Sequence, residues 1–253
     1  MTSDPVVVVL PDARLLAETT ASRLLLAIVD AQSIASPVHV ALTGGTVGIA
    51  TLEAAGRSPL ARAVDWSGVH VWWGDERFLP EGSADRNETQ ARAALLDHVP
   101  LPQSHIHAVP GPEQAGSPEV AAAVYADELA RYAEEGAATP RFAVLLLGVG
   151  PDGHVASLFP GLPGVNVRDR TVVGVEDSPK PPSQRVSLTV PAIGAARQVW
   201  LVAAGAEKAS AISQALEGAP ADAVPAGAVR GRDRTLWLLD AAAADVPGAA
   251  QVH

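Results

Sequence analysis

The chain has 253 residues, 48% of them hydrophobic, with a formal net charge of −10 and no cysteine. This composition excludes intrinsic disorder and a coiled coil, and the lack of cysteine excludes a disulfide scaffold, a thiolate nucleophile and Cys-ligated metals, as expected for a cytoplasmic protein. The acidic balance argues against nucleic-acid and anionic-membrane partners, no apolar stretch approaches the ~20 residues of a membrane span, and neither a secretory leader nor an obligate protein partner is evident.

The predicted elements alternate between strands and helices along the chain. Short β-branched or continuously apolar runs predict the strands, and apolar residues at helical spacing predict the helices. In chain order we expect a strand at 6–10, a helix at 12–33, a strand at 38–42, a helix at 47–63, a strand at 69–73, helices at 85–98 and 117–135, strands at 142–147, 171–175, 185–190 and 199–203, a helix at 207–216 and a strand at 236–239. This alternation predicts an α/β fold with a single doubly wound, mainly parallel sheet and helices on both faces. We expect one domain over residues 1–253, with a core at about 5–240, because the Gly/Pro-rich segments are too short for linkers.

A glycine-rich loop follows the second predicted strand. In sheets of this kind ligands bind beyond the carboxyl ends of the strands. Thr43, Gly44, Gly45 and Thr46 lie between that strand and a helix, where glycines permit close backbone approach and the helix N-terminus offers free N–H groups to a phosphate. The alternative is a tight turn in which Thr46 only caps the helix, and the motif alone does not decide between the two.

Three charged residues, Asp75, Glu76 and Arg77, follow two tryptophans at the end of the strand at 69–73. Asp75 could orient or deprotonate a substrate hydroxyl, and Arg77 could bind a phosphate through two hydrogen bonds. The alternative is a solvated turn with a structural Asp–Arg pair, since such pairs also gather at strand ends.

The most informative loop follows the strand at 142–147. Its Gly148-x-Gly150-x-x-Gly153 matches a dinucleotide-binding motif, but that motif needs a crossover helix, and the Pro/Gly-rich stretch at 160–164 would stop one after roughly two turns. What remains is Asp152 and His154 on a turn that Gly153 allows. The carboxylate would hold the histidine tautomer, so we expect the pair to be functional.

Two basic residues also lie at strand ends. Arg185 begins the strand at 185–190, and Lys208 lies at a strand-to-helix junction. Each alone is typical of a protein surface, but together with the glycine-rich loop they could hold a phosphate. We expect no metal site, because His105 and His107 lack a third ligand at a familiar spacing. We also expect no covalent serine catalysis, because no Gly-x-Ser-x-Gly elbow is present.

Five motifs, taken in order, resemble the glucosamine-6-phosphate isomerase/6-phosphogluconolactonase family, and most closely its lactonases. They are Thr43-Gly44-Gly45-Thr46, Trp73-x-Asp75-Glu76-Arg77 with Asp85-Arg86-Asn87 after it, the loop from Gly148 to Gly161, Arg185-Val186-Ser187-Leu188-Thr189, and Gly205-x-x-Lys208. The resemblance covers about residues 5–240. One departure is Gly48, where many relatives have proline.

The resemblance implies hydrolysis of the small-molecule phosphosugar lactone 6-phospho-D-glucono-1,5-lactone, without a metal or organic cofactor. It implies that His154 is the general base and that Asp152 orients it or the substrate, while the loop from Thr43 to Thr46 and the cations Arg77, Arg185 and Lys208 surround the phosphate or the developing oxyanion. One alternative is an amino-sugar phosphate deaminase, which carries a further acid after the histidine, whereas residues 155–160 contain no Asp or Glu. Another is a phosphosugar-binding protein without turnover, which no DNA-binding helix or appended domain supports.

Overall fold

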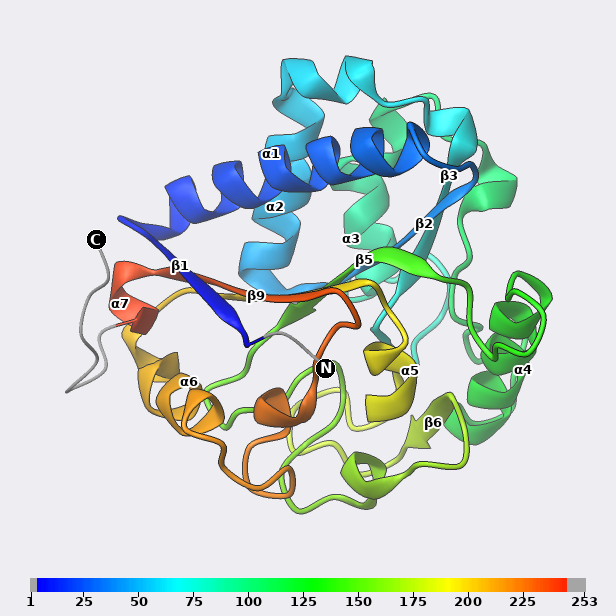
Figure 1. Cartoon of the computed structure of the whole chain (residues 1–253). Coiled ribbons are helices and arrows are strands. Elements are labelled where there is room, and N and C mark those ends of the chain that lie inside the picture. The colour runs from blue at the N-terminus through cyan, green and yellow to red at the C-terminus, as the bar shows by residue number, and fades with distance from the viewer. Residues whose placement is uncertain (1–3, 245–253) are drawn as a thin grey trace.

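A six-stranded parallel sheet forms the centre of the molecule (Figure 1). The computed structural model describes residues 4–244. The strand order is β1-β9-β8-β5-β2-β3, and all pairings are parallel. The strands are β1 (Val6–Leu10), β2 (Val38–Leu42), β3 (Val69–Trp73), β5 (Phe142–Gly148), β8 (Gln198–Ala203) and β9 (Arg234–Asp240). The predicted α/β architecture is confirmed.

Helices cover both faces of this sheet. Helices α1 to α3 lie on one side, and α5 and α6 lie on the other (Figure 1). Their bounds are α1 (Ala13–Gln32), α2 (Gly45–Arg57), α3 (Asn87–Ala94), α4 (Pro118–Arg131), α5 (Val190–Gly194), α6 (Ala209–Leu216) and α7 (Ala241–Ala244). Within residues 4–244, no helix is both long and apolar enough to cross a membrane.

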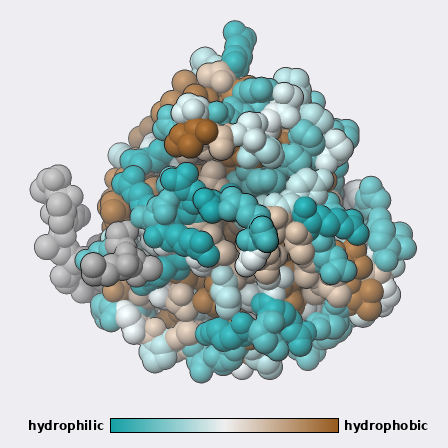
Figure 2. Space-filling model, turned by 45° about the vertical axis from the view of Figure 1, so that its right-hand side comes forward, coloured by the Kyte–Doolittle hydropathy of each residue, from teal (hydrophilic) through white to brown (hydrophobic). Residues whose placement is uncertain are grey.

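Alternating side chains of the buried strands build two hydrophobic cores. Val40 and Leu146 belong to the core under α1 to α3, whereas Ala41 and Leu147 belong to the core on the opposite face. Strands buried on both faces need apolar residues at nearly every position, which is why these runs are continuously hydrophobic. The outer face in Figure 2 is mostly hydrophilic, with hydrophobic residues in small groups.

A second, three-stranded antiparallel sheet departs from the single sheet that the sequence predicts. It contains β4 (Asp75–Arg77), β7 (Arg185–Leu188) and β6 (Val172–Val175), in the order β4-β7-β6. The predicted strands at 171–175 and 185–190 therefore exist but lie outside the parallel sheet. Strand β7 ends two residues early because the Thr189 side chain accepts a hydrogen bond from the Ala192 N–H and caps α5.

Three of the observed helices end several residues earlier than predicted. Helix α2 ends at Arg57, before a 3₁₀ segment at Pro59–Ala63, because a proline does not continue the α-helix. The helix predicted at 85–98 is α3 followed by a 3₁₀ turn at Leu96–His98. Helix α4 begins as predicted, with Ser117 as N-cap and Pro118 in its first turn, but it ends at Arg131.

Candidate active site

A cavity of about 340 Å³ lies beyond the carboxyl ends of β2 and β5. The loops that the sequence predicts to be functional meet there, although they come from widely separated parts of the chain between residues 43 and 208. The predicted site residues that line the cavity are Thr43, Gly44, Gly45, Thr46, Asp75, Arg77, His154, Arg185 and Lys208. Asp152 does not line it, but contacts His154 directly.

His154 and Asp152 form a close pair on the loop that follows the carboxyl end of β5. The distance from His154 Nδ1 to Asp152 Oδ1 is 2.5 Å. Gly153 between them has a φ of +79°, a conformation that side chains disfavour, and this turn brings the two groups together. Burial by itself would raise the pKa of Asp152, but the hydrogen bond from His154 and the nearby charges of His154 and Lys180 hold that pKa well below its usual range.

This geometry leaves the other imidazole nitrogen free for chemistry. With Nδ1 donating to a carboxylate, the neutral ring carries its lone pair on Nε2. Among the described residues, none forms a hydrogen bond with Nε2 of His154. His154 can therefore accept a proton from a molecule in the cavity.

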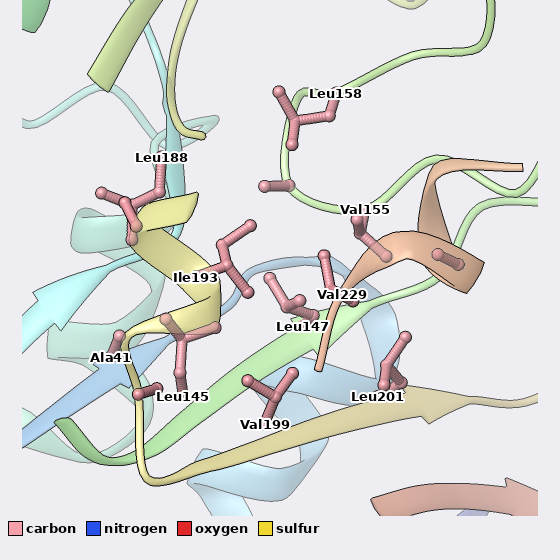
Figure 3. Close-up of a cluster of buried hydrophobic side chains, with 14 of the residues drawn as sticks. Ala41, Leu145, Leu147, Val155, Leu158, Leu188, Ile193, Val199, Leu201 and Val229 are labelled. Carbon is pink, nitrogen blue, oxygen red and sulfur yellow. The ribbon is translucent and has the colours of Figure 1, made fainter. Parts of the chain in front are cut away.

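The loop that carries His154 is anchored in the hydrophobic core. Val155 and Leu158 point into the cluster that includes Leu147 of β5 and Leu188 of β7 (Figure 3). Turns and isolated bridges follow the glycines, and a 3₁₀ turn starts only at Pro163, so the crossover helix of a dinucleotide site does not begin here. The buried side chains of Val155 and Leu158 therefore fix the conformation of this turn.

Asp75 fastens β4 to this loop. Its Oδ2 atom accepts a 2.7 Å hydrogen bond from the Ser157 hydroxyl, and the Ser157 N–H donates to the Ser187 hydroxyl at 3.1 Å. Ser157 therefore links the loop to both β4 and β7. Asp75 also lines the cavity, where it can contact a substrate.

Glu76 faces away from the cavity and has a structural role. Its carboxylate accepts N–H bonds of 2.7 to 2.8 Å from Arg77, Asn87 and Glu88, two of which cap the first turn of α3. Burial raises the pKa of Glu76 to about 7, against the lowering effects of Arg86 and of these N–H groups. Within the described residues no ion pair joins Asp75 to Arg77, so the alternative of a structural Asp–Arg pair is wrong.

The glycine-rich loop opens α2 toward the cavity. The N-cap of α2 is Gly44, which offers no side-chain cap, so Thr46 lies in the first turn and does not cap the helix. Thr43 Oγ1 accepts a 3.1 Å hydrogen bond from the Gly148 N–H and so ties β2 to β5. The loop residues from Thr43 to Gly48 line the cavity, where the N-terminal N–H groups of α2 can bind an anion.

Asn87 was not predicted as a site residue. A Cβ atom on Gly44 would lie 1.9 Å from its Oδ1 atom, so only glycine permits this contact. Asn87 Nδ2 donates to the Asp75 carbonyl at 2.9 Å, and its buried Oδ1 atom has no hydrogen-bond partner within residues 4–244. The contact joins positions 43 residues apart in sequence, which local patterns do not reveal.

Four cationic side chains line the cavity of this acidic protein: Arg77, Lys180, Arg185 and Lys208. Burial lowers the pKa of Lys208, and the nearby Lys180 lowers it further. Burial also lowers the pKa of Arg185, whose guanidinium donates to the Pro181 and Pro182 carbonyls at 3.0 Å each. The sequence does not single out Lys180, because it lies in a proline-rich loop without a recognisable motif. The signal that could have found it is the scarcity of lysine, since Lys180 and Lys208 are the two lysines of the chain.

His105 and His107, the two histidines considered as metal ligands, both stack on the ring of His70 near the start of β3. His70 Nδ1 lies 2.8 Å from His107 Nε2, and the His107 ring stacks on Trp72. His107 Nδ1 contacts the Glu128 carboxylate at 2.9 Å. Over residues 4–244, no group of three or more His, Cys, Asp or Glu side chains is arranged to hold a metal ion.

The chain matches a known protein family. The model of the glucosamine-6-phosphate isomerases/6-phosphogluconolactonases matches residues 11–237. The chain belongs to this family.

Within the family, the lactonases are similar over nearly the whole chain. A 6-phosphogluconolactonase of Streptomyces coelicolor is 55% identical over 248 residues, which cover 96% of this chain and 95% of that protein. The structure of a 6-phosphogluconolactonase from Trypanosoma cruzi superimposes with a TM-score of 0.84 at 25% identity, covering 97% of each chain. A monomeric glucosamine-6-phosphate deaminase shares the fold, with a TM-score of 0.78 at 18% identity, covering 95% of this chain and 99% of that one.

Proposed function

We propose that this protein hydrolyses 6-phospho-D-glucono-1,5-lactone to 6-phosphogluconate, the second step of the oxidative pentose phosphate pathway, in the cytoplasm. The observation that carries the proposal is the His154–Asp152 pair at the edge of a cavity lined by four cations and a helix N-terminus. The similarity to lactonases over nearly the full chain supports the same activity. The substrate combines a phosphate with an activated ester, and the cavity offers groups for both.

The first chemical step is attack of water on the lactone carbonyl. Nε2 of His154 takes a proton from water as the oxygen bonds to the carbonyl carbon, and Asp152 stabilises the imidazolium that forms. The tetrahedral oxyanion is stabilised by N–H groups or cations in the cavity. A positioned base contributes roughly 10²–10⁴-fold to such a step.

Collapse of this intermediate completes the reaction. The bond between the carbonyl carbon and the ring oxygen breaks, and the imidazolium returns its proton to that oxygen. The product is an open-chain acid that ionises to a carboxylate. The phosphate is held by the N–H groups at the start of α2 and by Arg77, Arg185 and Lys208, which face it across the cavity.

A direct assay tests the proposal. Freshly made 6-phosphogluconolactone is mixed with the purified protein, and 6-phosphogluconate is measured by a coupled, NADP-dependent oxidation after subtraction of spontaneous hydrolysis. We expect turnover well above the spontaneous rate. Release of ammonia from glucosamine 6-phosphate with no effect on the lactone would favour a deaminase, and binding without turnover of either compound would favour a phosphosugar-binding protein.

A further inference from the structure

Lys180 lies beside the hydrogen bond between Asp152 and His154. Its Nζ atom is 3.5 Å from Asp152 Oδ1 and 3.3 Å from His154 Nδ1. The side chain is 39% exposed and also lines the cavity. A positive charge therefore sits next to both members of the proposed catalytic pair.

The backbone of Lys180 is held in place on both sides. Its N–H donates to the Ser178 hydroxyl oxygen at 3.2 Å, and its carbonyl accepts from the same hydroxyl at 2.9 Å. The Arg185 guanidinium donates to that carbonyl at 3.2 Å. Two prolines follow at once, which further restrict the backbone. The ammonium is thus brought to the pair by an ordered segment.

We infer that Lys180 is a positioning residue for the lactonase reaction, which holds the Asp152 carboxylate ionised against His154 and extends the activity toward lower pH. The inference rests on the proposed function. The cations assigned to the phosphate lie on other elements, namely Arg77 on β4, Arg185 on β7 and Lys208 before α6.

Two electrostatic effects of the ammonium support this role. It stabilises the Asp152 carboxylate, and a carboxylate at this position fixes the tautomer that leaves Nε2 unprotonated. It also repels a second positive charge on the adjacent imidazole, whose Nδ1 atom is 3.3 Å from the ammonium. Both effects act on the protonation state of the pair, and neither requires contact with the substrate.

The other charged groups of the cavity do not replace Lys180. Those that face the pair from neighbouring elements are Asp75 and Arg77 on β4, Arg185 on β7 and Lys208 before α6. Among the described residues, the basic side chains within 4 Å of the Asp152 carboxylate are Lys180 and His154. Removing Lys180 should therefore leave the pair without a nearby compensating charge.

The test is the pH dependence of kcat/KM for 6-phosphogluconolactone from about pH 5 to about pH 8. In Lys180→Met and Lys180→Gln, we expect the acid limb of the profile to move up by about one pH unit. Lys180→Arg keeps the charge and should restore the wild-type limb. Lys208→Met is the matched control, since it removes the other lysine of the same cavity and should raise KM while leaving the limb in place.

The unphosphorylated D-glucono-δ-lactone separates this role from phosphate binding. A positioning role predicts the same displacement of the acid limb with both substrates. An unmoved limb, a displacement that Lys180→Arg does not reverse, or an effect confined to KM for the phosphorylated lactone would each overturn the inference. Absence of turnover by the unsubstituted protein would overturn the proposed function itself.

Discussion

Acid should destabilise the fold through His39, at the end of the sheet opposite the active site. His39 is 9% exposed, and its Nδ1 atom accepts a 3.1 Å hydrogen bond from Trp72 Nε1. Protonation would replace this acceptor by a donor facing the indole N–H. Burial lowers the pKa of His39 to about 4, and the neighbouring His70, His107 and His105 add to the effect.

The size of this loss of stability follows from the difference in the pKa of His39 between the folded and unfolded chains. The unfolded chain takes up a proton on His39 near its ordinary pKa of about 6.5, whereas the folded chain resists it until about pH 4, so stability falls as the pH drops between these values. Between pH 7 and pH 5, His39 alone should cost about 2 kcal/mol of unfolding free energy. This is a substantial share of the ~5–15 kcal/mol that is typical of a domain.

Urea unfolding at pH 7 and at pH 5 measures this loss. In His39→Gln, whose amide oxygen can still accept from Trp72, we expect the difference between the two pH values to shrink by about 2 kcal/mol. His98→Gln is the matched control, because His98 is exposed, and its pH dependence should follow the wild type. If His39→Gln lost as much stability on acidification as the wild type, the reasoning would be refuted.

Three further predictions concern the cavity. His154→Ala should lower kcat by roughly 10²–10⁴-fold with little change in KM, as steady-state kinetics would show, and an unchanged rate would remove His154 from the mechanism. Arg185→Ala and Lys208→Ala should raise KM for the phosphorylated lactone but not for D-glucono-δ-lactone; equal damage to both substrates would contradict a phosphate role. Gly44→Ala, whose Cβ would lie 1.9 Å from Asn87 Oδ1, should cost about 1–3 kcal/mol in thermal or urea unfolding, and adding Asn87→Ala should remove the clash. An undamaged Gly44→Ala single variant would show that the contact is not tight.

The parallel sheet was predictable because short stretches of neighbouring residues are enough to mark its strands. Each buried strand is apolar at most of its positions, and Phe142–Gly148 is apolar throughout. Each is followed by a loop and a helix or turn. The antiparallel sheet was not predictable in this way. Strand β4 consists of Asp75, Glu76 and Arg77, and these charged residues become a strand only because they pair with Arg185–Ser187. That pairing spans more than 100 residues and leaves no hydrophobic period in the sequence.

Some residues of the candidate site could be predicted from the sequence, and others could not. The loops at strand ends carry glycines, threonines and the Asp152–His154 pair, so their positions followed from the expected topology. Asn87 and Lys180 did not follow. The place of Asn87 depends on a missing side chain at Gly44, and that of Lys180 depends on the path of a loop between β6 and β7. Both positions depend on the tertiary structure, which local sequence patterns do not predict.

The anchoring of Val155 and Leu158 has a consequence for each turnover. Because these side chains belong to the hydrophobic core, the segment around His154 cannot open without exposing core surface to water. Its conformational entropy is lost when the protein folds, so a substrate meets a base that is already oriented. Amide hydrogens of this irregular loop should accordingly exchange with solvent about as slowly as those of the neighbouring strands.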